Sequence, residues 1–64
     1  MDLTESIKFR ILEIINETDK SWQLKINGGI VDWFPKSHCR IIGKYIYIPE
    51  WLIEAKDIDI NFKG

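Results

Sequence analysis

SWQLKINGGIVDWFP, the sequence of residues 21–35, has the pattern of a β-hairpin. Apolar and polar side chains alternate over residues 21–27, as in a strand with one buried face. Asn27-Gly28 is the favoured pair for a tight type I′ turn, and Gly29 is able to follow at positive φ. Residues 30–34 then form the return strand, and Pro35 ends it because proline has no amide proton for the ladder. The apolar face of the first strand consists of Trp22, Leu24 and Ile26.

The segment that follows the hairpin predicts a second strand pair and a helix. Residues 39–42 and 44–48 form the strands, which join near Gly43. Residues 49–56 then suit a short helix, because proline fits a first helical turn and the charges at the two ends match the helix dipole. Strict alternation over residues 57–63 predicts a final strand. The helix presents an apolar face of Trp51, Leu52 and Ala55.

Residues 3–15 fit two patterns. Leu3, Ile7, Ile11 and Ile14 have helical spacing, and Thr4 could cap a helix. Against this, residues 7–11 alternate and, after a slip of one residue, the alternation resumes. Such a slip is typical of a β-bulge, and isoleucine favours strands. We therefore predict a bulged strand, connected to the hairpin through residues 17–20.

Together these elements predict a mainly β fold of five or six short strands with one short helix near residues 49–56. A highly curved antiparallel sheet or small open barrel is the natural way to close such a chain. The 64 residues form a single domain. Because so small a domain needs large side chains in its core, we expect the three tryptophans to be buried.

Composition excludes several classes of protein. The net charge of −1 and pI near 5.7 argue against a protein that coats DNA nonspecifically. The first residues have neither the positive charge nor the apolar run of a signal peptide, and no stretch is apolar enough to span a membrane. With a single cysteine, Cys39, no internal disulfide forms. We expect a cytoplasmic protein.

Catalytic and metal sites find little support in the sequence. His38 and Cys39 are neighbours, and side chains of neighbours on an extended chain point to opposite faces. One histidine and one cysteine cannot supply a structural zinc site. Asp57 and Asp59 share a face and could hold a divalent cation, although a solvated strand face explains them better. We expect no enzyme activity, no cofactor and no metal.

Basic and aromatic residues gather in the middle of the chain. Residues 20–44 carry a net charge of +4, between flanks of −3 (residues 1–19) and −2 (residues 45–64). Small β-barrels that bind single strands stack bases on aromatic rings and hold phosphates with Lys or Arg. Burial of the tyrosines and a merely solvated loop at residues 35–40 remain the alternatives. The candidate binding residues are Lys25, Lys36, Ser37, His38, Arg40, Lys44, Tyr45 and Tyr47.

The runs WFPKSH (residues 33–38) and IYIPEWL (residues 46–52) resemble a small module recurrent in phage and prophage proteins. The resemblance covers about residues 14–56. It departs at His38, where the module usually has glutamine, and after the helix, where Lys-Lys-Gly often follows in the module. It implies a phage setting and no defined activity. In size and charge the chain is also similar to anti-CRISPR proteins, the inhibitors of RNA-guided nucleases, including one that acts on a Cas13b effector.

Two functions from different classes follow. In the first, the protein is an inhibitor that docks on a host effector protein or ribonucleoprotein, where acidic residues meet a positively charged channel. In the second, it binds RNA or single-stranded DNA itself, through the candidate binding residues. So small a sheet also has exposed edge strands, which could pair with those of a second copy to form a homodimer. The predicted acidic docking face consists of Glu13, Glu17, Asp19, Glu50 and Glu54, with Asp57 and Asp59 beside it.

Overall fold

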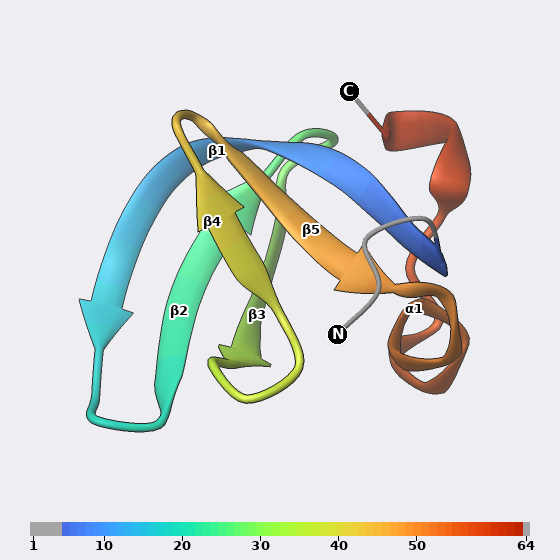
Figure 1. The fold of residues 1–64 in the computed structure, drawn as a ribbon. Helices are drawn as coiled ribbons and strands as arrows, with labels where there is room; N and C mark the ends of the chain where they lie inside the picture. Colours follow the sequence, from blue (N-terminus) through green and yellow to red (C-terminus); the bar gives the residue numbers. More distant parts are fainter. Residues whose placement is uncertain (1–4, 64) are drawn as a thin grey trace.

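A computed structural model describes residues 5–63, and in it one antiparallel sheet of five strands is followed by a short helix and a 3₁₀ turn (Figure 1). The strands lie in the order β3-β2-β1-β5-β4. The sheet curls without closing, so the prediction of a mainly β, highly curved open sheet is confirmed. No helix within residues 5–63 is long and apolar enough to cross a bilayer. The elements are β1 (Ser6–Glu17), β2 (Ser21–Ile26), β3 (Ile30–Pro35), β4 (Arg40–Ile42), β5 (Tyr45–Pro49), α1 (Glu50–Lys56) and η2 (Ile60–Phe62).

Strand β1 divides between two neighbours. Residues 6–10 pair with β5, and residues 11–17 pair with β2. The β1–β2 register shifts between Ile11 and Glu13 and again between Ile14 and Asn16. Such bulges bend a strand and increase its twist, and β1 accordingly arches over the sheet (Figure 1). The predicted bulged strand is confirmed over the described residues. Positions 3 and 4, on which the helical alternative partly relied, lie outside them.

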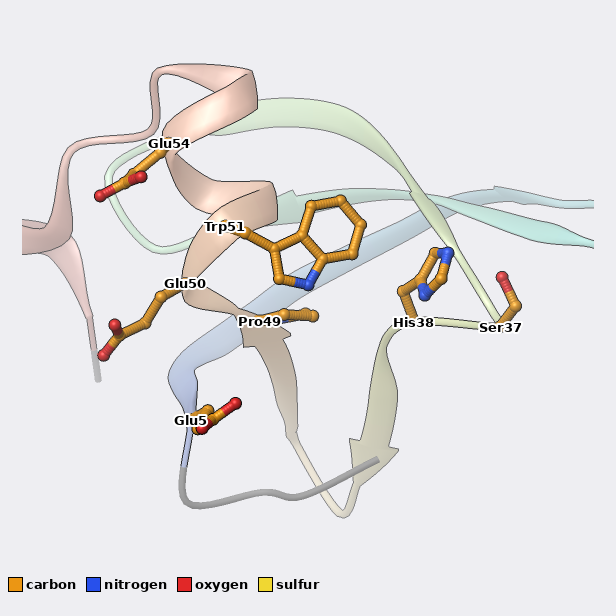
Figure 2. A pocket seen from close by; sticks show the side chains of 7 residues that line it. All are labelled: Glu5, Ser37, His38, Pro49, Glu50, Trp51 and Glu54. Carbon is orange, nitrogen blue, oxygen red and sulfur yellow. The ribbon is translucent and has the colours of Figure 1, made fainter.

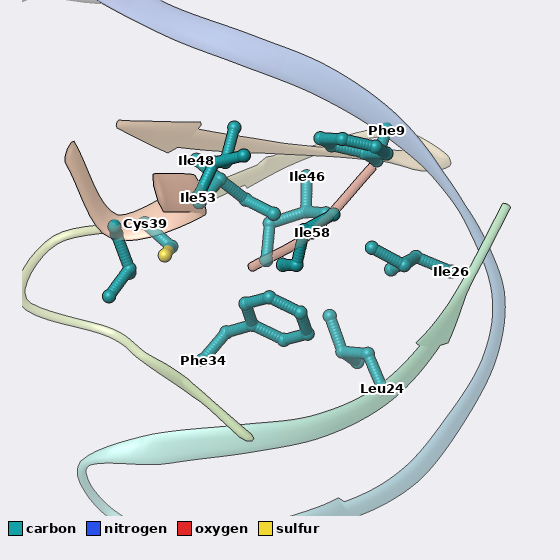
Figure 3. Close-up of a cluster of buried hydrophobic side chains, with 10 residues drawn as sticks. Phe9, Leu24, Ile26, Phe34, Cys39, Ile46, Ile48, Ile53 and Ile58 are labelled. Carbon is teal, nitrogen blue, oxygen red and sulfur yellow. The ribbon is translucent and has the colours of Figure 1, made fainter. Parts of the chain in front are cut away.

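The core fills the concave side of the curled sheet (Figure 3). Phe9 from β1 and Phe34 from β3 are its largest fully buried side chains. Helix α1 closes one end of the core, and Lys56 of this helix forms an ion pair with Asp32 of β3 at 3.2 Å. Ile46 and Ile48 are buried while the two tyrosines of β5 are not, as the alternation predicted. The core residues are Phe9, Leu24, Ile26, Phe34, Cys39, Ile46, Ile48, Leu52, Ile53 and Ile58.

Two predictions about the aromatic residues are wrong. Trp33 is 39% exposed and Trp51 is 55% exposed, and Trp22 is only partly buried. Trp33 lies opposite Gln23 on the convex side of the β2–β3 pair, because it is Phe34 that faces inward. Helix α1 buries Leu52 and Ile53 instead of the predicted face that included Trp51 and Ala55. Aliphatic side chains and phenylalanines therefore fill the centre of this core, and of the three indoles only Trp22 packs against it.

The prediction of a final strand over residues 57–63 is also wrong. Asp57 adopts left-handed geometry, with φ 56° and ψ 42°, and ends α1. The Asp57 amide donates to the Glu54 carbonyl, and the Ile58 amide donates to the Ile53 carbonyl. This is the hydrogen-bond pattern of a Schellman motif, in which the residue after the left-handed one packs back on the helix. Burial of Ile58 redirects the chain, and the segment then continues as η2.

The turn between β2 and β3 differs in detail from the prediction. A type I′ turn needs positive φ at both central residues, but Asn27 does not have it, whereas Gly28 (φ 88°) and Gly29 (φ 77°) do. The Gly29 amide donates to the Ile26 carbonyl at 3.0 Å. Asn27 Nδ2 donates at 2.9 Å to the carbonyl of Phe62, whose ring covers Gly28. The turn therefore serves as the docking point of the C-terminal segment.

Replacing Gly28 with alanine should destabilise the fold more than the same change at Gly29. Both positions have positive φ, which costs an alanine about 1 kcal/mol. A Cβ at Gly28 would also lie 2.6 Å from Cδ2 of Phe62, whereas one at Gly29 would meet nothing within 4 Å. Urea unfolding should show a loss of about 1 kcal/mol for G29A and about 2 kcal/mol or more for G28A. The excess should disappear in a Phe62→Ala background; if it persists there, the Phe62 contact is not its cause.

Candidate nucleic-acid interface

Basic and aromatic side chains share the outer face of β4, β5 and β1. Residues directly opposite each other in antiparallel strands lie on the same face. One row across the strands is Lys8, Tyr47 and Arg40, and the next row is Arg10, Tyr45 and Ile42. The intervening positions face inward, where Phe9 and Ile46 are buried. We call the group Lys8, Arg10, Arg40, Tyr45 and Tyr47 the tyrosine face.

The charged residues of the tyrosine face are all cations. Its Lys and Arg residues are exposed, its two tyrosines are half-buried, and none of its positions is acidic. Lys8 Nζ lies 4.5 Å from the centre of the Tyr45 ring, a cation–π contact that holds the two side chains together. Lys44, in the turn between β4 and β5, adds a further exposed charge at the margin, and the Ile11 amide donates to its carbonyl. The face thus combines two rings with three cations.

Of the predicted binding residues, the structure brings together only Arg40, Tyr45 and Tyr47, with Lys44 beside them. Lys25 lies on β2, opposite Glu13 and Val31. Lys36 forms an ion pair with Glu17 at 2.6 Å and lies 5.4 Å from the Trp22 ring centre. Ser37 and His38 line a cleft beside α1.

Lys8 and Arg10 belong to the tyrosine face although they are not among the predicted binding residues. The sequence held a signal for them: residues 7–11 alternate, so Lys8 and Arg10 share the face opposite to Phe9. What alternation alone did not reveal is that this part of β1 pairs with β5. Only the register places the two cations beside the tyrosines.

A cleft of about 670 Å³ separates α1 from the β3–β4 loop. Figure 2 shows the Trp51 indole between three carboxylates on one side and His38 and Ser37 on the other. The His38 and Trp51 rings meet edge to face, with centroids 5.0 Å apart. An exposed tryptophan in an acidic setting is suited to contact with a positively charged partner. The cleft is lined by Glu5, Ser37, His38, Pro49, Glu50, Trp51 and Glu54.

The acidic residues do not form the single docking face that the sequence predicted. Glu50 and Glu54 line the cleft, where Glu5 joins them. Glu13, Glu17 and Asp19 lie on the second half of β1 and in the β1–β2 connection, at the other side of the molecule (Figure 1). Of this second group, Glu17 is already paired with Lys36. The cleft is therefore the compact acidic site, and Glu13, Glu17 and Asp19 are separate from it.

The cysteine is placed as a core residue. Cys39 is buried and His38 is exposed, so the two do not form a nucleophilic pair. Burial raises the pKa of the Cys39 thiol from 9.0 to about 11, although nearby Lys56 opposes the shift. Within residues 5–63, no group of three or more His, Cys, Asp or Glu side chains is placed so that it could hold a metal ion. No protein family, curated protein or solved structure matches the chain.

Cys39 should react slowly with a thiol reagent such as dithionitrobenzoate in the folded protein. The thiolate is the reactive form, and the rise in pKa from 9.0 to about 11 lowers its amount at pH 8 about a hundredfold. Absorbance at 412 nm should show fast labelling in urea and labelling at least a hundredfold slower without it. The folded rate should keep rising with pH up to about 11. A folded rate that levels off near pH 9 would contradict the assignment.

Proposed function

We propose that this protein binds single-stranded nucleic acid on the tyrosine face. The observation that carries the proposal is the register of β1 and β4 against β5, which surrounds Tyr45 and Tyr47 with Lys8, Arg10 and Arg40. Aromatic rings stack on bases of any sequence, and cations around them follow the phosphates. An open outer face that carries both rings and cations can stack bases and contact phosphates without a closed pocket.

The geometry of β5 suits successive bases. Tyr45 and Tyr47 are two residues apart on one strand, so about 6.5 Å separates their backbones. That spacing is close to the rise between nucleotides of an extended single strand, and each ring can take one base. Lys8 already lies on one side of the Tyr45 ring, so a base at that position uses the other side or displaces the amine.

Charge limits the strength of this binding. The whole chain has a net charge of −1, so attraction comes from the local group of three cations and not from the molecule as a whole. For single strands the logarithm of affinity falls with the logarithm of salt concentration with a slope of about −0.7 for each phosphate neutralised. Three contacts predict a slope near −2. The proposal is therefore a short, salt-sensitive site without sequence preference.

The Lys8→Ala, Arg10→Ala double variant should lose most of its affinity for single strands. Both side chains are exposed, so the fold should remain, while two of the three phosphate contacts disappear. Fluorescence anisotropy with labelled oligouridylate and oligothymidylate at 20 mM salt should show affinity reduced about tenfold or more. The Tyr45→Ala, Tyr47→Ala double variant should reduce the affinity by a similar factor, because it removes the rings on which bases stack.

The matched control is Lys20→Ala, Lys25→Ala, which removes the same charge away from the tyrosine face. This variant should keep affinity within about twofold, because neither lysine lies on that face. Equal losses in the two double variants would mean that only total charge matters. If unaltered protein at high micromolar concentration does not bind either oligonucleotide at 20 mM salt, the proposed function is wrong.

A second function is favoured by a separate observation, the exposed Trp51 within the acidic cleft. In this proposal the protein docks on a positively charged surface of a nucleic-acid-handling complex in the bacterial cytoplasm, a target suggested by the resemblance in size and charge to anti-CRISPR proteins. Trp51 would serve as the buried anchor of the interface, since tryptophan is enriched among residues that dominate binding energy. Glu5, Glu50 and Glu54 would meet Lys or Arg of the partner.

Reversal of charge in the cleft should abolish inhibition of a guide-loaded Cas13b effector, measured as cleavage of a labelled target RNA. The test variant is Glu50→Lys, Glu54→Lys, and the control is Glu13→Lys, Asp19→Lys, which changes charge equally outside the cleft. Inhibition should be lost in the first and kept in the second. If both double variants still inhibit the effector, the protein does not dock through the cleft. If the unaltered protein does not inhibit the Cas13b effector, this effector is not its target.

A further inference from the structure

A second, smaller cleft lies at the start of β1, next to the tyrosine face. It has a volume of about 400 Å³ and is lined by Ser6, Ile7, Lys8 and Lys63. Lys8 belongs to the tyrosine face as well, so the two sites are continuous. Neither Lys8 nor Lys63 takes part in the two ion pairs found within residues 5–63, and none of the four lining residues is acidic.

The fold brings Lys63 to this cleft by a chain of specific contacts. Asp59 accepts a hydrogen bond from the Asn61 amide at 2.9 Å and so caps η2. The Phe62 ring packs over Gly28, and its carbonyl accepts from Asn27 Nδ2. The Lys63 amide donates to the Ile60 carbonyl. Because the turn between β2 and β3 holds η2, Lys63 follows at a defined place beside the start of β1.

We propose that the cleft between Lys8 and Lys63 binds a phosphate group of the nucleic acid held on the tyrosine face, an inference that rests on the proposed function. Arg40, Tyr47 and Lys8 form one row across β4, β5 and β1, and Lys63 continues it beyond β1. Neighbouring strands are about 4.8 Å apart. The row therefore spans roughly 15 to 20 Å, the length of about three nucleotides of an extended strand.

The surroundings favour a nucleic-acid strand that turns at Tyr47 toward Lys8 and Lys63 over one that continues along β5 past Tyr47. β5 ends at Pro49, and Glu5 and Glu50 lie there in the acidic cleft. A polyanion that ran along β5 toward its C-terminal end would meet these carboxylates, which repel phosphates. A path across the strands meets cations at both ends. Charge complementarity thus selects the phosphodiester chain as the occupant of the smaller cleft.

Lys63→Ala tests the inference, with Lys20→Ala as the matched control. Lys63 is exposed at the end of the described chain, so its truncation should leave unfolding by urea unchanged. Anisotropy with oligouridylates of two to eight nucleotides should show affinity about fivefold lower for K63A with the longer ones, and the salt slope should become less steep by about 0.7. With dinucleotides, which cannot reach both ends of the row, K63A should match the unaltered protein. K20A should match it throughout.

The outcomes separate this inference from the function on which it rests. One outcome is that the Lys8→Ala, Arg10→Ala double variant reduces affinity while the Lys63→Ala variant changes neither affinity nor salt slope. In that case the tyrosine face binds nucleic acid and the smaller cleft does not. If K63A and K20A weaken binding equally, the effect of Lys63 is one of total charge, and the inference is likewise overturned. Absence of binding by the unaltered protein would overturn the proposed function first.

Discussion

The division of β1 between two partners is the constraint on which the rest of the structure depends. A strand of twelve residues pairs with β5 through its first half and with β2 through its second. Two bulges lie in the second half, and the bend lets two strand pairs face each other across a common core. Phe9, on the first half, is completely buried there. A straight strand would leave one face of a flat, small sheet in water, with no second layer to cover it.

The same register separates the core from the proposed binding surface. Phe9 and Ile46 are opposite each other and point inward, so Lys8, Arg10, Tyr45 and Tyr47 must point outward. A one-residue slip in the β1–β5 pairing would exchange these sets and bury the cations. The hydrophobic effect that fixes the register for stability thus also fixes the positions of the tyrosines among the cations. The function proposed for this face therefore depends on the packing of the opposite one.

Local pattern predicted the strands well and the C-terminal end of the chain poorly, for a physical reason. Alternation reports which side chains can share a face, and it identified β1, β2, β3 and β5. It could not exclude a strand over residues 57–63, because that segment also alternates. The deciding event there is a single left-handed residue, Asp57, and the burial of Ile58 against α1. The exposed Trp51 and Trp33 were missed for a related reason: large apolar side chains suit a core, but the register assigns the inward positions.

Charge along the chain and charge in space are different quantities in this protein. Lys8 and Arg10 come from the acidic N-terminal third, yet they supply most of the charge on the tyrosine face. Lys25 and Lys36 come from the basic middle third and lie away from it.

The acidic residues divide in the same way, because β1 begins beside α1 and ends at the opposite side of the molecule. Glu5 and Glu50 therefore border the tyrosine face at the end of β5, whereas Glu13 and Glu17 lie away from it. A positively charged partner bound in the cleft would neutralise the carboxylates that repel a polyanion from this border. The two proposed activities are consequently compatible on one surface, since occupation of the acidic cleft removes the repulsion that limits the length of nucleic acid beside it.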